Sequence, residues 1–202
     1  FNDDESAVNY WKSICTPVNH LSFSMQHGAN ISGSFQSSST GITLNILYQK
    51  EEASCQLALL GAHNAQNALA AISLAQACQI PLQQACSSLD GFKGVTGRQQ
   101  FLNGLKGSRL IDDSYNANPD SLAVAVNVLC ALEGEHWLAL GDMAELGEQS
   151  EALHIEAVKH AHEKGVDQFF ALGDMSCRSA KVFGSAGYCF SQHDEMASFI
   201  AQ

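Results

Sequence analysis

The chain has 202 residues, of which 46% are hydrophobic and only 15% are charged, a composition typical of a globular protein and not of a disordered one. Its formal net charge of −11 argues against nucleic acid as a partner, because a phosphate backbone is bound by clustered Lys and Arg. No apolar run reaches the ~18 residues of a membrane-spanning helix, so we expect no membrane insertion.

The first stretch, up to about Gln56, is predicted to form a β-meander. Hydrophobic and polar residues alternate in Leu21–Met25 and again in Ile42–Leu47, which is the pattern of half-buried strands. A Ser-rich run at 32–41 lies between these two segments.

Two helices and a joint follow. An Ala-rich helix is predicted from Ala62 to Gln79, where it ends because a residue before proline is disfavoured in the helical region. A second helix is predicted over Pro81–Leu89, with its proline at the start. Three glycines then predict a hinge or domain boundary near Gly94–Arg98.

Beyond this joint the predicted elements alternate between strand and helix, which indicates βαβ crossovers and a mostly parallel, Rossmann-like sheet covered on both faces. Ligands of such α/β sheets bind at the carboxyl ends of the strands. The expected pairs of strand and helix are Arg109–Asp112 with Pro119–Leu132, His136–Leu140 with Ser150–Lys164, Gln168–Leu172 with Ser176–Phe183, and Tyr188–Phe190 with Asp194–Ala201.

A polar cluster, Asp112–Ser121, follows the first of these strands. Asn118 is a good N-cap and Pro119 a good first helical residue, so part of the cluster is explained as the start of a helix. Two adjacent carboxylates and two further polar residues are more than a turn needs, and we expect a functional role for them. These residues are Asp112, Asp113, Tyr115 and Asn116.

A second cluster, Gly141–Gly147, also follows a predicted strand. Asp142 and Glu145 are candidate acceptors for an ammonium group or a metal-bound water. The alternative is a solvated loop with ordinary acidic residues. After the next strand, Asp174 is predicted to be a helix N-cap.

The start of the Ala-rich helix carries His63, Asn64 and Asn67. Asn64 and Asn67 share a face where free backbone N–H groups favour anions, and such a set suits a base or a ribose. A cap or an ordinary surface histidine is the alternative. At the joint, the guanidinium of Arg98 suits a phosphate.

The cysteines and histidines predict neither a metal site nor a disulfide framework. Seven Cys without a Cys-x-x-Cys pair are expected to be free thiols in a reducing cytoplasm. His154, His160 and His162 do not share one ligand face of their helix, and we expect them on the surface. The phosphate-binding pattern Gly-x-x-x-x-Gly-Lys-Ser/Thr is absent from the sequence.

In order and spacing, four segments of the chain resemble the Mur ligase family. They are Gly61-x-His63-Asn64-x-x-Asn67-Ala68-x-Ala70-Ala71, then Gly97-Arg98, then Asp112-Asp113-Ser114-Tyr115-Asn116-Ala117-Asn118-Pro119-x-Ser121, then Leu140-Gly141-Asp142-Met143-x-Glu145-Leu146-Gly147 with Ser150 and His154. The third and fourth look like the members that add D-alanyl-D-alanine to UDP-N-acetylmuramoyl-tripeptide.

The resemblance implies an enzyme of three domains, of which this chain holds two parts. Residues 1–96 are then the end part of the central ATP-binding domain, and 97–202 most of the C-terminal Rossmann-like domain. The chain looks cut from a longer protein: the phosphate-binding loop is expected upstream of Phe1, and a Lys-Gly-Ser-Arg segment beyond Gln202. We therefore expect the chain on its own to be inactive.

The resemblance also implies the chemistry, an ATP- and Mg²⁺-dependent amide ligation in the cytoplasm through an acyl phosphate. It assigns His63, Asn64 and Asn67 to adenine and ribose, Arg98 to phosphate and Asp113 to ribose. It lines the catalytic cleft with Asp113, Tyr115, Asn116 and Asn118, and offers Asp142 and Glu145 to the incoming dipeptide. The alternatives are another Mur-type or folylpolyglutamate-type amide ligase, or a non-catalytic nucleotide-binding module.

Overall fold

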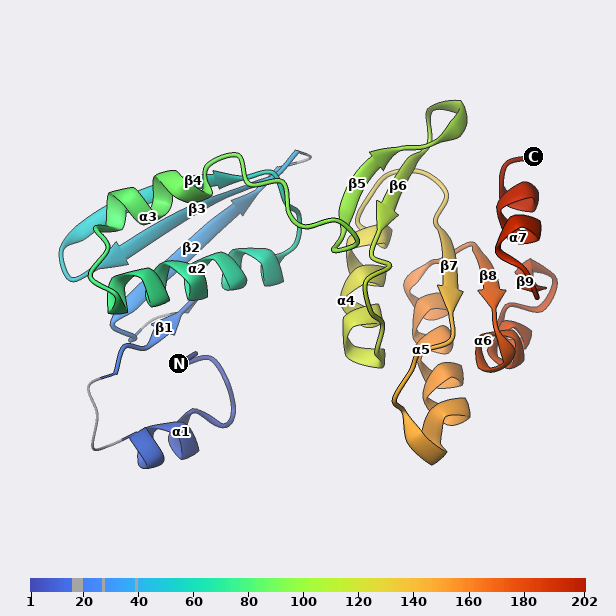
Figure 1. Cartoon of the computed structure of the whole chain (residues 1–202), viewed down its shortest axis with the longest axis horizontal. Helices are drawn as coiled ribbons and strands as arrows, with labels where there is room; N and C mark the ends of the chain where they lie inside the picture. The colour runs from blue at the N-terminus through green and yellow to red at the C-terminus, as the bar shows by residue number, and fades with distance from the viewer. Residues whose placement is uncertain (16–19, 27, 39) are drawn as a thin grey trace. The chain divides into compact units, whose positions relative to one another are not determined.

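The computed structural model describes residues 1–15, 20–26, 28–38 and 40–202. Contacts divide the chain into two compact units, Phe1–Gly94 and Val95–Gln202 (Figure 1). None of the helices formed by the described residues is long and apolar enough to cross a membrane.

The first unit is a sheet with helices packed on it. Its strands lie in the order β1 (Phe23–Ser24), β2 (Ile31–Ser37), β3 (Ile42–Tyr48) and β4 (Glu51–Leu57). The pairs β2–β3 and β3–β4 are antiparallel, which confirms the predicted meander, and β1 runs parallel to β2. Helices α2 (Ala62–Ala77) and α3 (Leu82–Leu89) bury Leu69 and Cys86 against this sheet, whereas the short helix α1 (Val8–Cys15) was not predicted and buries no residue.

Residues 32–37 of the Ser-rich run belong to strand β2, which was not predicted. Ile31, Gly33 and Phe35 of β2 alternate toward the core. A Cβ atom at Gly33 would lie 2.8 Å from Leu69 Cδ2, so the glycine leaves room for this buried side chain of α2 at an inward position. Because position 33 has no hydrophobic side chain, the alternation of hydrophobic and polar residues that predicts a strand is interrupted. Ser39 of the same run lies outside the described residues.

The second unit contains a two-stranded and a three-stranded sheet. Strands β7 (Trp137–Gly141), β8 (Gln168–Leu172) and β9 (Gly187–Phe190) are parallel, as predicted. Strand β6 (Arg109–Asp112) was expected to belong to the parallel sheet, but it pairs antiparallel with β5 (Gln100–Asn103) in a hairpin. The chain reverses there because Gly104 N donates to Ser108 O at 2.9 Å and Lys106 takes a left-handed φ of 54°.

Helices cover both faces of the parallel sheet. Phe169 and Ala171 of β8 are buried in one core with residues of α4 (Pro119–Cys130) and α5 (Ser150–Lys164). On the other face Phe170 stacks on Tyr188, with ring centroids 5.3 Å apart, and packs against α7 (His193–Ile200). The predicted helix Ser176–Phe183 divides into α6 (Asp174–Ser179) and a 3₁₀ stretch, Ala180–Ala186.

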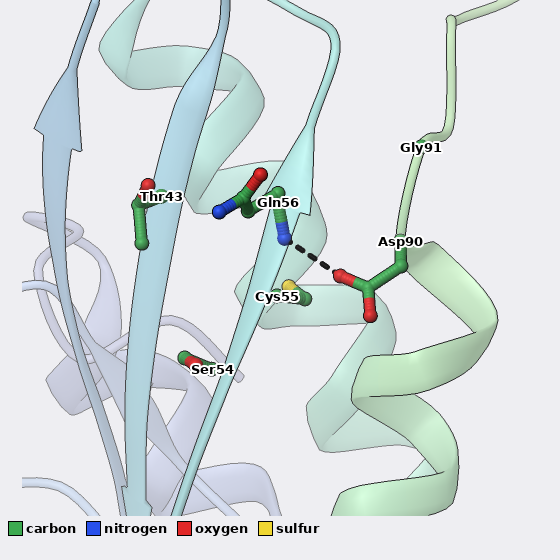
Figure 2. Close-up of a pocket in the computed structure, with 6 residues that line it drawn as sticks. All are labelled: Thr43, Ser54, Cys55, Gln56, Asp90 and Gly91. Carbon is green, nitrogen blue, oxygen red and sulfur yellow. Dashed lines mark hydrogen bonds between the residues drawn. The ribbon is translucent and has the colours of Figure 1, made fainter.

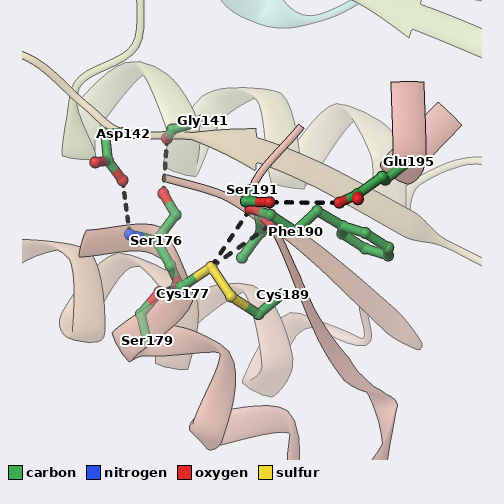
Figure 3. Close-up of a disulfide and its surroundings, with 10 residues drawn as sticks. Gly141, Asp142, Ser176, Cys177, Ser179, Cys189, Phe190, Ser191 and Glu195 are labelled. Carbon is green, nitrogen blue, oxygen red and sulfur yellow. Dashed lines mark hydrogen bonds between the residues drawn. A yellow bond between two sulfur atoms is a disulfide. The ribbon is translucent and has the colours of Figure 1, made fainter. Parts of the chain in front are cut away.

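The prediction of free thiols throughout was wrong for one pair of cysteines. Cys177 of α6 and Cys189 of β9 form a disulfide, with Cα atoms 5.1 Å apart (Figure 3). No sequence motif links the two residues. They meet because β9 pairs with β8 and α6 follows β8 in the chain. The remaining cysteines of the described residues are free thiols: Cys15, Cys55, Cys78, Cys86 and Cys130.

Candidate functional site

The first candidate cluster lies at the carboxyl end of β6. Because β5 runs antiparallel to β6, the residues before β5 lie beside those after β6. Gln99 N donates to Asp113 Oδ1 at 3.1 Å, and Tyr115 N donates to Gly97 O at 3.0 Å. Asp113 and the residues around Arg98 are therefore brought to the same end of this hairpin.

Arg98 lies over the ring of Tyr115, with Cζ 4.0 Å from the ring centroid. Both side chains are exposed, so the stack leaves guanidinium N–H groups available to an anion. Gly97, by contrast, is buried, and its φ of +74° is unfavourable for a residue with a side chain. A Cβ there would approach Tyr115 N to 3.3 Å, so the glycine permits the close contact.

The side chain of Gln99 carries an unpaired polar atom. Its Oε1 is buried and has no hydrogen-bond partner among the described residues. Gln99 also takes a left-handed φ of 49°, which is uncommon for a residue with a long side chain. A buried acceptor without a donor is rare in folded proteins and marks this cluster as one that can take a further donor. The sequence reading did not single out Gln99.

Of the remaining residues in the cluster, some form hydrogen bonds that the fold uses and others are exposed to solvent. Asn118 and Ser121 form a capping box at the start of α4, since Ser121 N donates to Asn118 Oδ1 at 2.8 Å and Asn118 N to Ser121 Oγ at 3.0 Å. The predicted N-cap is confirmed. Asn116 accepts only from its neighbour Ala117 N in the described contacts, at 3.0 Å, and stays exposed. Asp112 accepts from Ser114 N at 3.1 Å.

In the second candidate cluster, the loop after β7, Asp142 is bound to the start of α6. Ser176 N donates to Asp142 Oδ1 at 2.8 Å. Burial opposes ionisation of this carboxyl, but the backbone hydrogen bonds from Ser176 and Met175 outweigh it and hold the pKa of Asp142 below its usual value. The prediction of Asp174 as the N-cap of α6 was wrong, because Gly173 holds that position. The N–H of Ser176 in the first turn of α6 is bound instead by Asp142, which lies in the loop after β7.

Glu145 lies in the same loop but makes no such bond in the described contacts. It is exposed and takes a left-handed φ of 62°. The structure therefore brings Asp142 and Glu145 into one loop, with one carboxylate bound to α6 and the other open to solvent.

His154, which we expected on the surface, is fully buried. Its Nε2 accepts from Met143 N at 2.8 Å, so Nδ1 carries the proton and donates to Ser150 O at 2.7 Å. A signal was present in the sequence, because the spacing places His154 on one helical face with the hydrophobic Val158 and Ala161. All three residues are buried in the structure. His154 thus fixes the loop that bears Asp142 and Glu145.

The third candidate cluster, in the first unit, is the start of α2. Gly61 precedes the helix with a φ of 92°, and no side chain caps it. Asn64 Nδ2 donates back to Leu60 O at 2.8 Å, His63 is half-buried and Asn67 is exposed. This opening turn is not sealed in apolar packing, so its polar groups are accessible.

A hollow of about 330 Å³ in the first unit contains none of the predicted site residues (Figure 2). Asp90 Oδ1 accepts from Gln56 N at 2.8 Å and Gly91 N donates to Gln56 O at 2.9 Å, so the chain after α3 covers the edge of β4 here. Burial, followed by the neighbouring Cys86 and Asp90, raises the pKa of Cys55 to about 12, and its thiol is therefore a poor nucleophile. The hollow is lined by Thr43, Ser54, Cys55, Gln56, Asp90 and Gly91.

Matches to family models cover most of the chain. Residues 97–201 match the model described as Mur ligase, glutamate ligase domain, and residues 1–75 match the Mur ligase middle domain. The chain belongs to the Mur ligase family.

Within the Mur ligase family, the chain is similar to UDP-N-acetylmuramoyl-tripeptide–D-alanyl-D-alanine ligases. It is 40% identical to that of Escherichia coli (strain K12) over 120 residues, which are 59% of this chain and 26% of the relative. It is 28% identical to that of Buchnera aphidicola subsp. Baizongia pistaciae over 197 residues, or 97% of this chain and 43% of the relative. The chain thus spans less than half the length of these curated relatives.

Solved structures of Mur ligases share the fold. A MurF from Acinetobacter baumannii superposes with a TM-score of 0.86 at 24% identity, covering 98% of this chain and 44% of that one. MurF from Thermotoga maritima in complex with ADP gives a TM-score of 0.76 at 18% identity, covering 96% and 45%. At these identities the likeness shows the fold alone.

Proposed function

We propose that the protein to which this chain belongs is an ATP-dependent ligase that adds D-alanyl-D-alanine to UDP-N-acetylmuramoyl-tripeptide through an acyl phosphate. The observation that carries the proposal is the similarity to ligases of that name in Escherichia coli and Buchnera. The polar clusters at the carboxyl ends of β6 and β7 supply groups suited to such a reaction. The chain alone, which spans only part of its relatives, is proposed to be inactive.

The cluster after β6 fits a nucleotide. The Arg98 guanidinium offers N–H donors to phosphate, and Asp113 offers carboxylate oxygen to ribose hydroxyls. The unpaired Oε1 of Gln99 is one more acceptor in the cluster. We propose that Arg98 and Asp113 hold the nucleotide and that Tyr115, Asn116 and Asn118 line the reaction cleft, with Asn118 acting chiefly through its bond to Ser121.

The start of α2 fits the adenosine part of ATP by its amide and imidazole groups. We propose that His63, Asn64 and Asn67 contact adenine and ribose. We also assign 1–96 to the central ATP-binding domain and 97–202 to the C-terminal ligase domain. The two ranges matched by family models, 1–75 and 97–201, support this division.

The loop after β7 fits an ammonium group, which is the positively charged end of D-alanyl-D-alanine. Hydrogen bonds hold the pKa of Asp142 below its usual value, so the group is a carboxylate at neutral pH, and Glu145 is exposed nearby in sequence. We propose that this loop receives the dipeptide and orients its amine.

Magnesium is proposed to enter with ATP. No group of three or more His, Cys, Asp or Glu side chains suited to a metal gathers among the described residues. Mg²⁺ commonly binds through substrate phosphates and only one or two carboxylates, so the ion needs few ligands from this chain. When bound, it neutralises charge on the transferring phosphoryl group. The cytoplasm, where ATP is available, is the proposed location.

The test is ATP-dependent phosphate release by the full-length protein. We expect release only when both UDP-N-acetylmuramoyl-tripeptide and D-alanyl-D-alanine are present, because the amine completes the reaction. Equal release with lysine or meso-diaminopimelate in place of the dipeptide would overturn the substrate assignment. Binding of ATP without any release would instead favour a nucleotide-binding module.

A further inference from the structure

The disulfide between Cys177 and Cys189 ties α6 to β9 (Figure 3). Cys189 pairs in register with Ala171 of β8, and α6 begins two residues after β8 ends. The backbone of three neighbouring elements therefore presents the two cysteines to each other, with Cα atoms 5.1 Å apart, well within the range that a disulfide can bridge. Their proximity is a property of the fold.

The surroundings of the two sulfur atoms suit both oxidation states. Cys189 is exposed and Cys177 half-buried, so a small thiol has access to the sulfur of Cys189. Cys177 Sγ lies 3.8 Å from Ala171 O and 3.8 Å from Phe190 O. In the disulfide this sulfur has no hydrogen to donate, but after reduction, once the two sulfur atoms have separated, the Cys177 thiol has two carbonyl acceptors close by.

The residue before Cys177 holds the loop after β7. Ser176 donates its N–H to Asp142 Oδ1 and its hydroxyl to Gly141 O, each at 2.8 Å. Ser176 is itself buried, and its carbonyl accepts from Ser179 Oγ at 2.7 Å. A covalent bond at Cys177 therefore restrains the helix that anchors Asp142.

We propose that Cys177 and Cys189 are a reversible modification site for low-molecular-weight thiols and disulfides, and that its oxidation tightens the loop after β7. The effect on the loop rests on the proposed function, in which this loop receives the dipeptide. Disulfides of cytoplasmic proteins are usually transient and redox-sensing, and exposed ones are the labile kind.

The exchange balances as an ordinary thiol–disulfide reaction. A small thiolate attacks Cys189 Sγ, the sulfur–sulfur bond breaks, and its electron pair leaves on Cys177 Sγ, which takes a proton. A second small thiolate attacks the mixed disulfide and releases the Cys189 thiolate together with the small-molecule disulfide. Two thiols are oxidised and one protein disulfide is reduced, and an excess of the small disulfide runs the steps backward.

The test equilibrates the full-length protein in mixtures of reduced and oxidised glutathione, traps free thiols with an alkylating agent and identifies linked peptides by mass spectrometry. We expect a Cys177–Cys189 link that appears and disappears in a single transition. It is lost in Cys177→Ser and Cys189→Ser but kept in the control Cys78→Ser, which changes an exposed, unpaired cysteine. Absence of the link at every ratio overturns the modification site.

A kinetic measurement on wild-type protein from the same mixtures, taken before alkylation, tests the coupling to the loop, and it needs no variant that must fold. We expect the KM for D-alanyl-D-alanine to rise about 5-fold on reduction, a modest coupling between two sites, with the KM for ATP unchanged. Equal dipeptide KM values in the two states overturn the coupling. If the link forms but neither the oxidised nor the reduced protein has ligase activity, the proposed function is overturned. The modification site is then still supported.

Discussion

Helices α2 and α4 both open on polar residues, but they use these residues differently. At α4 the side chains of Asn118 and Ser121 close a capping box, whereas α2 begins after Gly61 with no side-chain cap. Asn67, on the first turns of α2, remains exposed. A polar group bonded into a helix start is accounted for by folding, and one left open at a strand end or helix start is a better candidate for ligand binding.

The same contrast separates the acidic residues of the second unit. Asp142 is bound by the start of α6 and lies against Gly173, whereas Asp113 has one described hydrogen bond, from Gln99 N. Two carboxylates in similar sequence settings therefore differ in how far the fold itself requires them. Substituting a carboxylate that the fold requires should lower the stability of the protein. Substituting one that the fold does not require should lower activity more than stability.

Gly173→Ala is expected to have the largest effect, a loss of about 3 kcal/mol in the free energy of unfolding of the second unit. Gly173 has a φ of +106°, and a Cβ there would lie 2.6 Å from Asp142 Cγ. The matched control is Gly134→Ala, with a φ of +114° but no atom within 4 Å of the added Cβ. Urea unfolding of both variants isolates the contact with Asp142, and equal losses would contradict it.

Asp113→Ala is expected to lower kcat/KM for ATP in the full-length protein by about 100-fold, or about 2.7 kcal/mol of transition-state stabilisation. The change removes both the proposed ribose contact and the acceptor for Gln99 N. Asp120→Ala, in the first turn of α4, is the control and should leave activity within 2-fold, since only a dipole contribution of about 0.5 kcal/mol to stability is lost. Steady-state kinetics compare the two, and similar losses would count against the nucleotide role.

Asn118→Ala is expected to cost about 1 kcal/mol of stability, because it removes the N-cap oxygen that accepts from Ser121 N. Asn116→Ala removes only a bond to the adjacent Ala117 N and should change stability by less than about 0.5 kcal/mol. Thermal unfolding measures both. A larger loss of stability for Asn116→Ala than for Asn118→Ala would contradict the assignment of Asn118 to the fold and of Asn116 to ligand binding.

Arg98 and Tyr115 are expected to show a small coupling, about 0.5 to 1 kcal/mol in ATP binding, measured by calorimetry in a double-mutant cycle. The stack, with Cζ 4.0 Å from the ring centroid, is expected to order the guanidinium for the proposed phosphate contact. Tyr115→Phe keeps the ring and should keep the coupling, whereas Tyr115→Leu should remove it. Additive effects of Arg98→Ala and Tyr115→Leu would show that the stack does not position the arginine.

Much of the second unit follows from its sequence pattern. Helix Ser150–Lys164 and strand Gln168–Leu172 have the predicted bounds, because an amphipathic helix ended by a left-handed Gly165 leads to a hydrophobic strand. The hairpin of β5 and β6 was not predicted. Its turn contains two typical turn residues, Gly104 and Gly107, the latter with a φ of +81°, but also a left-handed Lys106, which is not a typical turn residue.

The candidate sites were predictable in part. The acidic and amide residues at the ends of β6 and β7 could be identified from their position after strands, but their hydrogen-bond partners could not. Asp142 is bound by Ser176, which lies 34 residues away, and Tyr115 by Gly97, which precedes a different strand. Gln99 and the pair Cys177–Cys189 gave no sequence signal, because tertiary packing alone determines their surroundings.

The anchoring of the loop after β7 limits how it can be re-engineered. Asp142 is held by α6 and Met143 by the imidazole of His154, so both attachment points belong to other elements. A chimaera that receives Gly141–Gly147 from a relative keeps these attachments if His154 is retained, because its imidazole binds a backbone N–H, and if an acceptor stays at Asp142. The exposed Ala144 and Glu145 are the positions where a mutant library can test the proposed dipeptide contact, with Glu145 limited to residues that tolerate its left-handed φ of 62°.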